Sequence, residues 1–119
     1  MSRIMIIDEN EYRRQVIRIA LEEEKYQVIV ANDLSEAWTR IMNVQLRPDL
    51  ILLSLEKYEN RHILRVLAKG FPDLPVIILS RHQNQAGKIN WQKNWHFVKI
   101  PFNPMALSDL ARRILVPVH

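Results

Sequence analysis

The sequence predicts an α/β fold in which a parallel five-stranded sheet is covered by helices on both faces. Five short apolar runs rich in Ile, Val and Leu recur along the chain, and a helical pattern follows each of them. Continuous rather than alternating apolar runs are typical of parallel strands buried on both faces. The length of 119 residues suits one hydrophobic core, so we expect residues 1–119 to form a single domain.

The predicted strands are all too short to be helices. They are Ile4–Ile7, Val28–Ala31, Leu50–Leu53, Val76–Leu79 and Phe97–Val98. Strands that alternate with helices are joined by right-handed crossovers, which leaves few topologies. For five strands at this length, a flavodoxin-like (βα)5 three-layer sandwich with strand order 2-1-3-4-5 fits best.

The predicted helices fill the intervals between the strands. They are Tyr12–Lys25, a segment that starts at Asp33, Asn60–Lys69, the polar stretch His82–Asn94 and Met105–Leu115. Asp33 and Asn103 are the expected N-caps of the second and last helices. Apolar spacing predicts that Ile19 faces the core in the first helix and Met42 in the second.

Composition excludes several classes of function. The chain has no cysteine, so disulfides and thiolate metal sites are impossible, and its two glycines form no Gly-rich phosphate loop. No segment approaches the roughly 18 uninterrupted apolar residues of a membrane span. The amino terminus reaches acidic residues too early for a secretory signal. We therefore expect a cytoplasmic domain that does not contact a membrane.

Positive charge is concentrated in the last third of the chain. Residues 1–80 carry 11 Lys/Arg against 12 Asp/Glu, and the whole chain has a formal charge of +4. Residues 81–119 have one acid, Asp109, and six basic side chains: Arg81, Lys88, Lys93, Lys99, Arg112 and Arg113. This asymmetry favours an acidic partner, protein or nucleic acid, although a simply hydrated surface is also consistent with it. Trp91 lies among these cations, where it could anchor a partner, and we expect Trp95 to pack inward.

The candidate site lies where the strands end, because ligands of doubly wound sheets bind beyond the carboxyl ends of the strands. Polar or charged residues follow four of the five predicted strands: Asp8 and Glu9, then Ser54 and Glu56, then Ser80 and Arg81, and finally Lys99 just before Ile100 and Pro101.

Five stretches make the chain resemble the receiver domain of two-component response regulators. They are IMIIDEN, NDLSEAW, RPDLILLSLE, DLPVIILS and FVKIPFNPMALSDLARRIL, in the family's order and with near-standard spacings. The resemblance implies a magnesium ion held by two acids after the first strand and a phosphate-accepting aspartate at the end of the third. It also implies a hydroxyl residue after the fourth strand and, after the fifth, a lysine followed by a cis proline.

Some of these positions match the family and others do not. Asp8 and Glu9 match the acid pair, Ser80 matches the hydroxyl residue and Pro101 matches the proline. The three departures are Ser54 at the acceptor position, Ile100 at the lysine position and Phe97 at the aromatic switch position, which is usually tyrosine.

The first two departures remove groups that phosphoryl transfer needs. An aspartate is both nucleophile and metal ligand, whereas a serine hydroxyl is neutral and needs a base. The one histidine that closely follows a predicted strand is His82, two residues past Ser80. Without the lysine, the phosphoryl oxygens lose a stabilising cation. Lys99 should point away from Ile100, because neighbouring side chains on a strand face opposite sides, unless a one-residue bulge re-aims it.

We therefore predict a non-enzymatic pseudo-receiver that acts in signalling by protein–protein contact, without phosphorylation. Asp8 and Glu9 either bind magnesium weakly or cap the first helix and stay hydrated. The resemblance implies a dimer or output surface on the fourth helix, fifth strand and fifth helix, so the expected contacts to an acidic protein or to a second copy are Arg81, Lys88, Trp91, Lys93, Lys99 and Arg112. The alternatives are a phosphorylatable receiver with Ser54 or Glu56 as acceptor, and a basic nucleic-acid-binding module.

Overall fold

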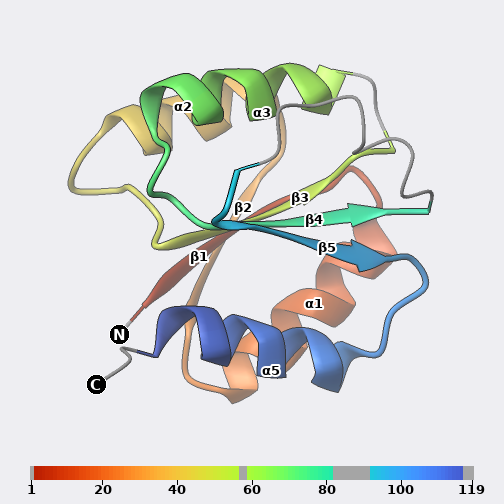
Figure 1. The fold of residues 1–119 in the computed structure, drawn as a ribbon. Helices are drawn as coiled ribbons and strands as arrows, with labels where there is room; N and C mark the ends of the chain where they lie inside the picture. The colour runs from red at the N-terminus through yellow and green to blue at the C-terminus, as the bar shows by residue number, and fades with distance from the viewer. Residues whose placement is uncertain (1, 57–58, 82–91, 117–119) are drawn as a thin grey trace.

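A parallel five-stranded sheet organises the computed structural model, which describes residues 2–56, 59–81 and 92–116 (Figure 1). The elements in chain order are β1 (Arg3–Ile7), α1 (Glu11–Glu23), β2 (Gln27–Ala31), α2 (Leu34–Met42), β3 (Leu50–Ser54), α3 (Glu59–Gly70), β4 (Val76–Ser80), β5 (Trp95–Lys99) and α5 (Pro104–Leu115). The strand order is β2-β1-β3-β4-β5, so the predicted topology is confirmed.

Part of the predicted fourth helix, His82–Asn94, lies outside the described residues, which resume at Gln92. Residues 93 and 94 form a turn that leads into β5.

The sheet separates two hydrophobic cores. Helices α2 and α3 cover one face, and α1 and α5 cover the other (Figure 1). Residues of one strand alternate between the cores, so that Met5 and Ile7 face α2 and α3 while Ile4 and Ile6 face α1 and α5. Burying side chains of this size stabilises the fold by about 1.5–3 kcal/mol each. Because each strand faces a hydrophobic core on both sides, most of its residues are apolar, and the strands appear in the sequence as continuous apolar runs.

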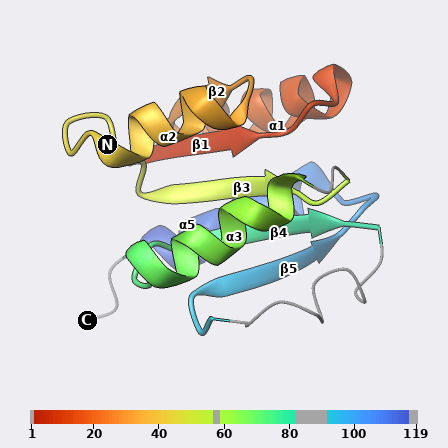
Figure 2. The ribbon, with the colours of Figure 1, turned by 90° about the horizontal axis from the view of Figure 1, so that it is seen from above.

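The strands run in the same direction, and their carboxyl ends meet at one edge of the sheet (Figure 2). In register, Ile7 lies opposite Leu53 and Ser80 lies opposite Lys99. The candidate residues that follow these strands are therefore gathered at that edge.

Two predictions about helix faces were wrong. Ile19 is 58% exposed and Met42 is 66% exposed. The buried face of α1 consists instead of Arg13, Ile17 and Leu21, which are spaced four residues apart along one side of the helix. An arginine on this face is paired with carboxylates, which is how a buried charge is normally accommodated.

Several local predictions are confirmed. Asp33 and Asn103 are N-caps, with side chains that accept hydrogen bonds from the backbone N–H of Glu36 and Met105 respectively. Trp95 is buried, and the Ile100–Pro101 peptide is cis.

Candidate functional site at the carboxyl edge of the sheet

Asp8 and Ser54 lie side by side because they end, or directly follow, the neighbouring strands β1 and β3. Both are buried, with 3% and 0% of their surface exposed. Glu9, the other acid of the predicted pair, is exposed to solvent. Only one of the two acids is therefore enclosed at this edge.

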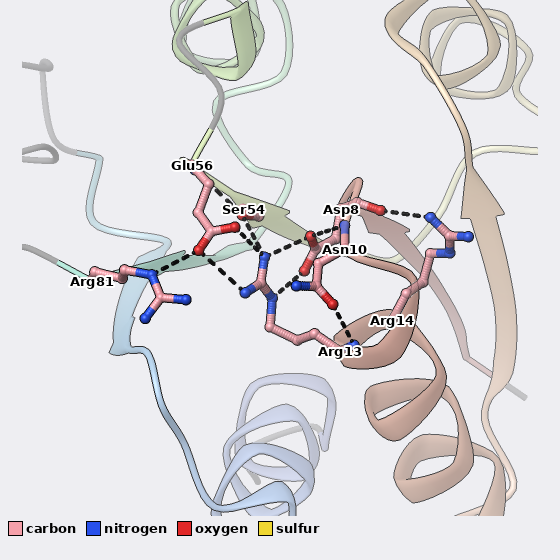
Figure 3. A network of polar contacts seen from close by, with 7 residues as sticks. All are labelled: Asp8, Asn10, Arg13, Arg14, Ser54, Glu56 and Arg81. Atoms are coloured by element: carbon pink, nitrogen blue, oxygen red, sulfur yellow. Dashed lines mark hydrogen bonds and ion pairs between the residues drawn. The ribbon is translucent and has the colours of Figure 1, made fainter.

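The Arg13 side chain extends from α1 into the space between these strands (Figure 3). Its Nε donates to Oδ2 of Asp8, and its Nη2 donates to Oδ1 of the same carboxylate at 2.7 Å. The Nη2 atom also lies 3.3 Å from Oγ of Ser54. A guanidinium that grips both oxygens of one carboxylate makes a strong, directional ion pair.

The start of α1 holds Arg13 in place. The Asn10 side chain caps the helix by accepting a hydrogen bond from the Arg13 backbone N–H at 2.9 Å. The backbone N–H of Asn10 donates to Oδ1 of Asp8, also at 2.9 Å. Arg14 donates to the backbone oxygen of Asp8 at 2.9 Å. Asn10 is thus the N-cap, and the expectation that Asp8 and Glu9 cap this helix was wrong.

Glu56 continues the network beyond Ser54. Arg13 donates to its two oxygens at 3.3 and 2.9 Å, and Nε of Arg81 donates to Oε1 at 2.9 Å. The Glu56 backbone N–H lies 3.4 Å from Oγ of Ser54. One chain of contacts therefore joins the ends of β1, β3 and β4 to helix α1 (Figure 3).

These contacts favour the charged forms of both Arg13 and Glu56. The hydrogen bond from Arg13 lowers the pKa of the Glu56 carboxyl below its ordinary value, while partial burial opposes this effect and Arg81 reinforces it. Burial disfavours the charge on Arg13, but Asp8 and Glu56 outweigh it and raise the pKa of the guanidinium. Near neutral pH, Arg13 is therefore a cation and Glu56 an anion.

The fifth strand places an apolar side chain beside this cluster. Ile100 is 6% exposed and packs in the core under α1 and α5, whereas Lys99 is exposed. The pairing of β4 with β5 is continuous from Val76–Trp95 to Ser80–Lys99, without the bulge that would re-aim Lys99. A cavity of about 230 Å³ is lined by Arg13, Ile100 and their neighbours, which are Asn10, Tyr12, Val16, Pro101 and Phe102.

The other two predicted pocket residues lie on β4 and β5. Ser80 is buried at the end of β4. Phe97 lies opposite Ile78 and packs against the core under α2 and α3.

The predicted partner residues do not form one patch among the described residues. Arg81 pairs with Glu56, and it lies with Lys99 at the carboxyl edge of the sheet. Lys93 precedes β5 at the opposite edge and is exposed. Arg112 is exposed on α5 and pairs with Asp109 at 2.8 Å. Lys88 and Trp91 lie outside the described residues.

Arg13 is the central residue of this site and was missed by reasoning from the sequence. The available signal was its spacing of four residues from Ile17 and eight from Leu21, which places it on the same helix face.

The comparisons with known proteins agree with this architecture. Residues 4–111 match the family described as response regulator receiver domain. The nitrogen assimilation regulatory protein NtrX of Azorhizobium caulinodans is 26% identical over 118 residues, which cover 94% of this chain and 26% of NtrX. The chain thus spans about a quarter of the length of this curated relative.

Two solved structures illustrate the shared fold. A receiver domain protein from Clostridium thermocellum has a TM-score of 0.79 at 21% identity, with 97% of this chain and 94% of that chain covered. TrrA from Thermotoga maritima, in complex with Mg2+ and BeF, has a TM-score of 0.77 at 20% identity, with 97% and 100% covered.

A parallel α/β domain with a polar cluster beyond β1 and β3 defines the class of protein. Because the family match extends over most of the chain, this protein belongs to the response regulator receiver domain family, whose members act in two-component signalling. The part of the chain that the structure describes contains no helix able to cross a membrane.

The magnesium ion that the family implies does not fit the residues as they are arranged. Both Asp8 oxygens already accept hydrogen bonds from Arg13, Ser54 offers a neutral oxygen, and Glu9 is exposed. Within residues 2–56, 59–81 and 92–116, no group of three or more His, Asp or Glu side chains could hold a metal ion. A hard divalent cation prefers several anionic oxygens. Here the buried anionic oxygens are those of Asp8, and the Arg13 guanidinium already binds both of them.

Proposed function

We propose that this receiver domain works in signal transduction through protein–protein contacts that do not depend on phosphorylation. One observation carries the proposal: the Arg13 guanidinium bonds Asp8, Ser54 and Glu56 at the same time. It occupies the space in which a phosphoryl group and its metal would have to be accommodated, and its ion pairs keep it charged there.

The side chains around Arg13 support the same proposal. The oxygen of Ser54 accepts from a cation, which draws electron density away from the atom that would have to attack a phosphodonor. Ile100 contributes a hydrocarbon surface where the family's lysine would bring an ammonium group. No enzymatic role is proposed, and the cytoplasmic setting stays a prediction from the sequence.

The alternative acceptor Glu56 is less well suited to the reaction. Its carboxylate is ionised, but hydrogen bonds from Arg13 and Arg81 engage its oxygens and reduce their nucleophilicity. Attack on a phosphodonor would require at least one of these ion pairs to break.

For the partner, we propose a protein with an acidic contact surface that binds through β5 and α5, or a second copy of this chain. The exposed charge of Lys99 at the carboxyl end of β5 favours such a partner. Lys93 lies at the opposite edge of the sheet, and the exposed charge of Arg112 on α5 is paired with Asp109. This surface would be able to bind its partner at all times, since the Arg13 ion pairs with Asp8 and Glu56 hold the pocket in one state.

The experiment is to incubate the protein with acetyl phosphate and Mg2+ and to measure its intact mass. We expect no phosphoryl adduct, because no described side chain combines a free nucleophile with a metal site. Ser54→Ala and Glu56→Gln are the matched variants. A stoichiometric adduct on the wild type would contradict the proposal, and its loss in one variant would identify the acceptor.

A further inference from the structure

The Arg13 side chain lies between two carboxylates, those of Asp8 and Glu56. Asp8 approaches it through both oxygens and Glu56 through both of its own, with contacts of 2.7 to 3.3 Å besides the Nε–Oδ2 pair. The Ser54 hydroxyl adds a neutral oxygen at 3.3 Å. The guanidinium is thus surrounded by oxygen atoms from the residue that follows β1, from the end of β3 and from the segment that follows β3.

A cation is required at this point. Asp8 is buried, and the Arg13 side chain is 9% exposed, so little water reaches the pair. Burying a carboxylate without a counter-charge destabilises the fold, because the charge loses its hydration. Removing one member of a buried ion pair leaves the other charge uncompensated. Two kinds of cation could fill this role, because either a guanidinium or a divalent ion can neutralise carboxylate oxygens.

The two kinds of cation exclude each other. A divalent ion would need the same oxygens of Asp8 and Glu56 that the guanidinium engages, and it would be repelled by the positive charge of Arg13. The guanidinium holds this position through its hydrogen bonds to both carboxylates.

We propose that Arg13 permanently replaces a divalent cation in this domain, and that Asp8 with Glu56 forms a divalent-cation site only when the guanidinium is removed. This inference rests on the proposed function, which it deepens by naming the residue that keeps the pocket in one state. Arg13 thus neutralises the carboxylates of Asp8 and Glu56, which a divalent cation would otherwise neutralise.

The test uses Mn2+ as a probe, with site-specific NMR line broadening as the readout. We expect no local broadening in the wild type at millimolar Mn2+. Arg13→Met, which keeps the aliphatic stem but lacks the guanidinium, should show broadening centred on Asp8, Ser54 and Glu56, with apparent affinity at least about tenfold higher. Adding Asp8→Asn to that variant should abolish the effect.

Arg18→Met is the matched control. It removes the same charge from the same helix, but the Arg18 guanidinium pairs with Glu22 at 2.7 Å and not with Asp8 or Glu56. It should behave like the wild type. Equal broadening in both arginine variants would show a general effect of net charge and would overturn the proposal.

Thermal unfolding with and without Mg2+ covers the case in which Arg13→Met is unstable. Mg2+ should raise the Tm of Arg13→Met, or restore its folding, and should leave the wild-type Tm unchanged. A variant that stays unfolded at millimolar Mg2+, or that folds without binding Mn2+, would overturn the inference, as would specific Mn2+ binding by the wild type.

The two proposals fail separately. Specific Mn2+ binding by an unphosphorylated wild type would overturn only the role given to Arg13. A phosphoryl adduct on a wild type that shows no Mn2+ broadening would overturn only the proposed function.

Discussion

Arg13, Ser54 and Ile100 are the residues that set the chemistry of the pocket, and the sequence alone predicts their positions to different degrees. Ser54 and Ile100 follow apolar runs, so the ends of the strands predict their positions. Arg13 could be located only by fixing the rotation of α1. Its burial depends on two carboxylates, Asp8 at five residues and Glu56 at 43 residues along the chain, and the distant pairing with Glu56 leaves no local pattern.

Restoring the family's acceptor alone should not restore the chemistry. We expect Ser54→Asp to take up little or no phosphoryl group from acetyl phosphate with Mg2+, as measured by intact mass. The new carboxylate would lie near Nη2 of Arg13, which contacts Ser54 at 3.3 Å, and would form another ion pair. Ile100 would still provide no cation for the phosphoryl oxygens.

The matched comparison for that experiment is the triple variant Arg13→Met/Ser54→Asp/Ile100→Lys. It removes the competing guanidinium and supplies both missing groups, so it should become labelled. Full labelling of the single variant Ser54→Asp would show that neither Arg13 nor Ile100 blocks the reaction.

At the scale of elements, the strands were predicted more accurately than the helix faces. A strand buried on both sides needs only a run of apolar residues, whereas a helix face depends on rotation about its axis. Apolar spacing placed Ile19 on the buried face, but the packing of α1 turns Arg13, Ile17 and Leu21 toward the sheet instead. Exposed apolar residues such as Ile19 are common on folded proteins and give no warning of this error.

The packing of α5 against β5 predicts the titration of His96. Burial lowers the pKa of His96 below its ordinary value, and the nearby charge of Arg113 lowers it further. His96 and Arg113 line a cavity of about 600 Å³ together with the acids Asp49 and Asp73. Because the unfolded chain binds this proton more readily, the contribution of His96 to stability is complete above pH 6.5, its ordinary pKa, and is lost as the pH falls below that value.

We expect Arg113→Met to raise the pKa of His96 toward its ordinary value, as followed by NMR titration of the imidazole. Arg112→Met removes the same charge from the neighbouring residue, which instead pairs with Asp109, and should move the pKa less. Equal shifts in the two variants would mean that the net charge of the helix matters and that the position of Arg113 does not.

At the scale of the whole molecule, the order of the sheet and the family could be predicted because five stretches occur in the right sequence and spacing. The state of the pocket could not be predicted, since it depends on contacts among β1, α1, β3 and β4 that form only in the folded chain. The domain keeps the parallel sheet of its family, while its own side chains link the strand ends that surround the pocket (Figure 3).

A closed pocket of this kind should not respond to a phosphoryl analogue. The most direct measurement is the amide NMR spectrum of the wild type, recorded before and after adding Mg2+ with beryllofluoride. We expect the signals of Asp8, Ser54, Glu56 and Phe97 to stay in place. Saturable shifts of these signals, spreading from the carboxyl edge of the sheet into β5, would show that the pocket binds the analogue and switches, and would contradict the proposed function.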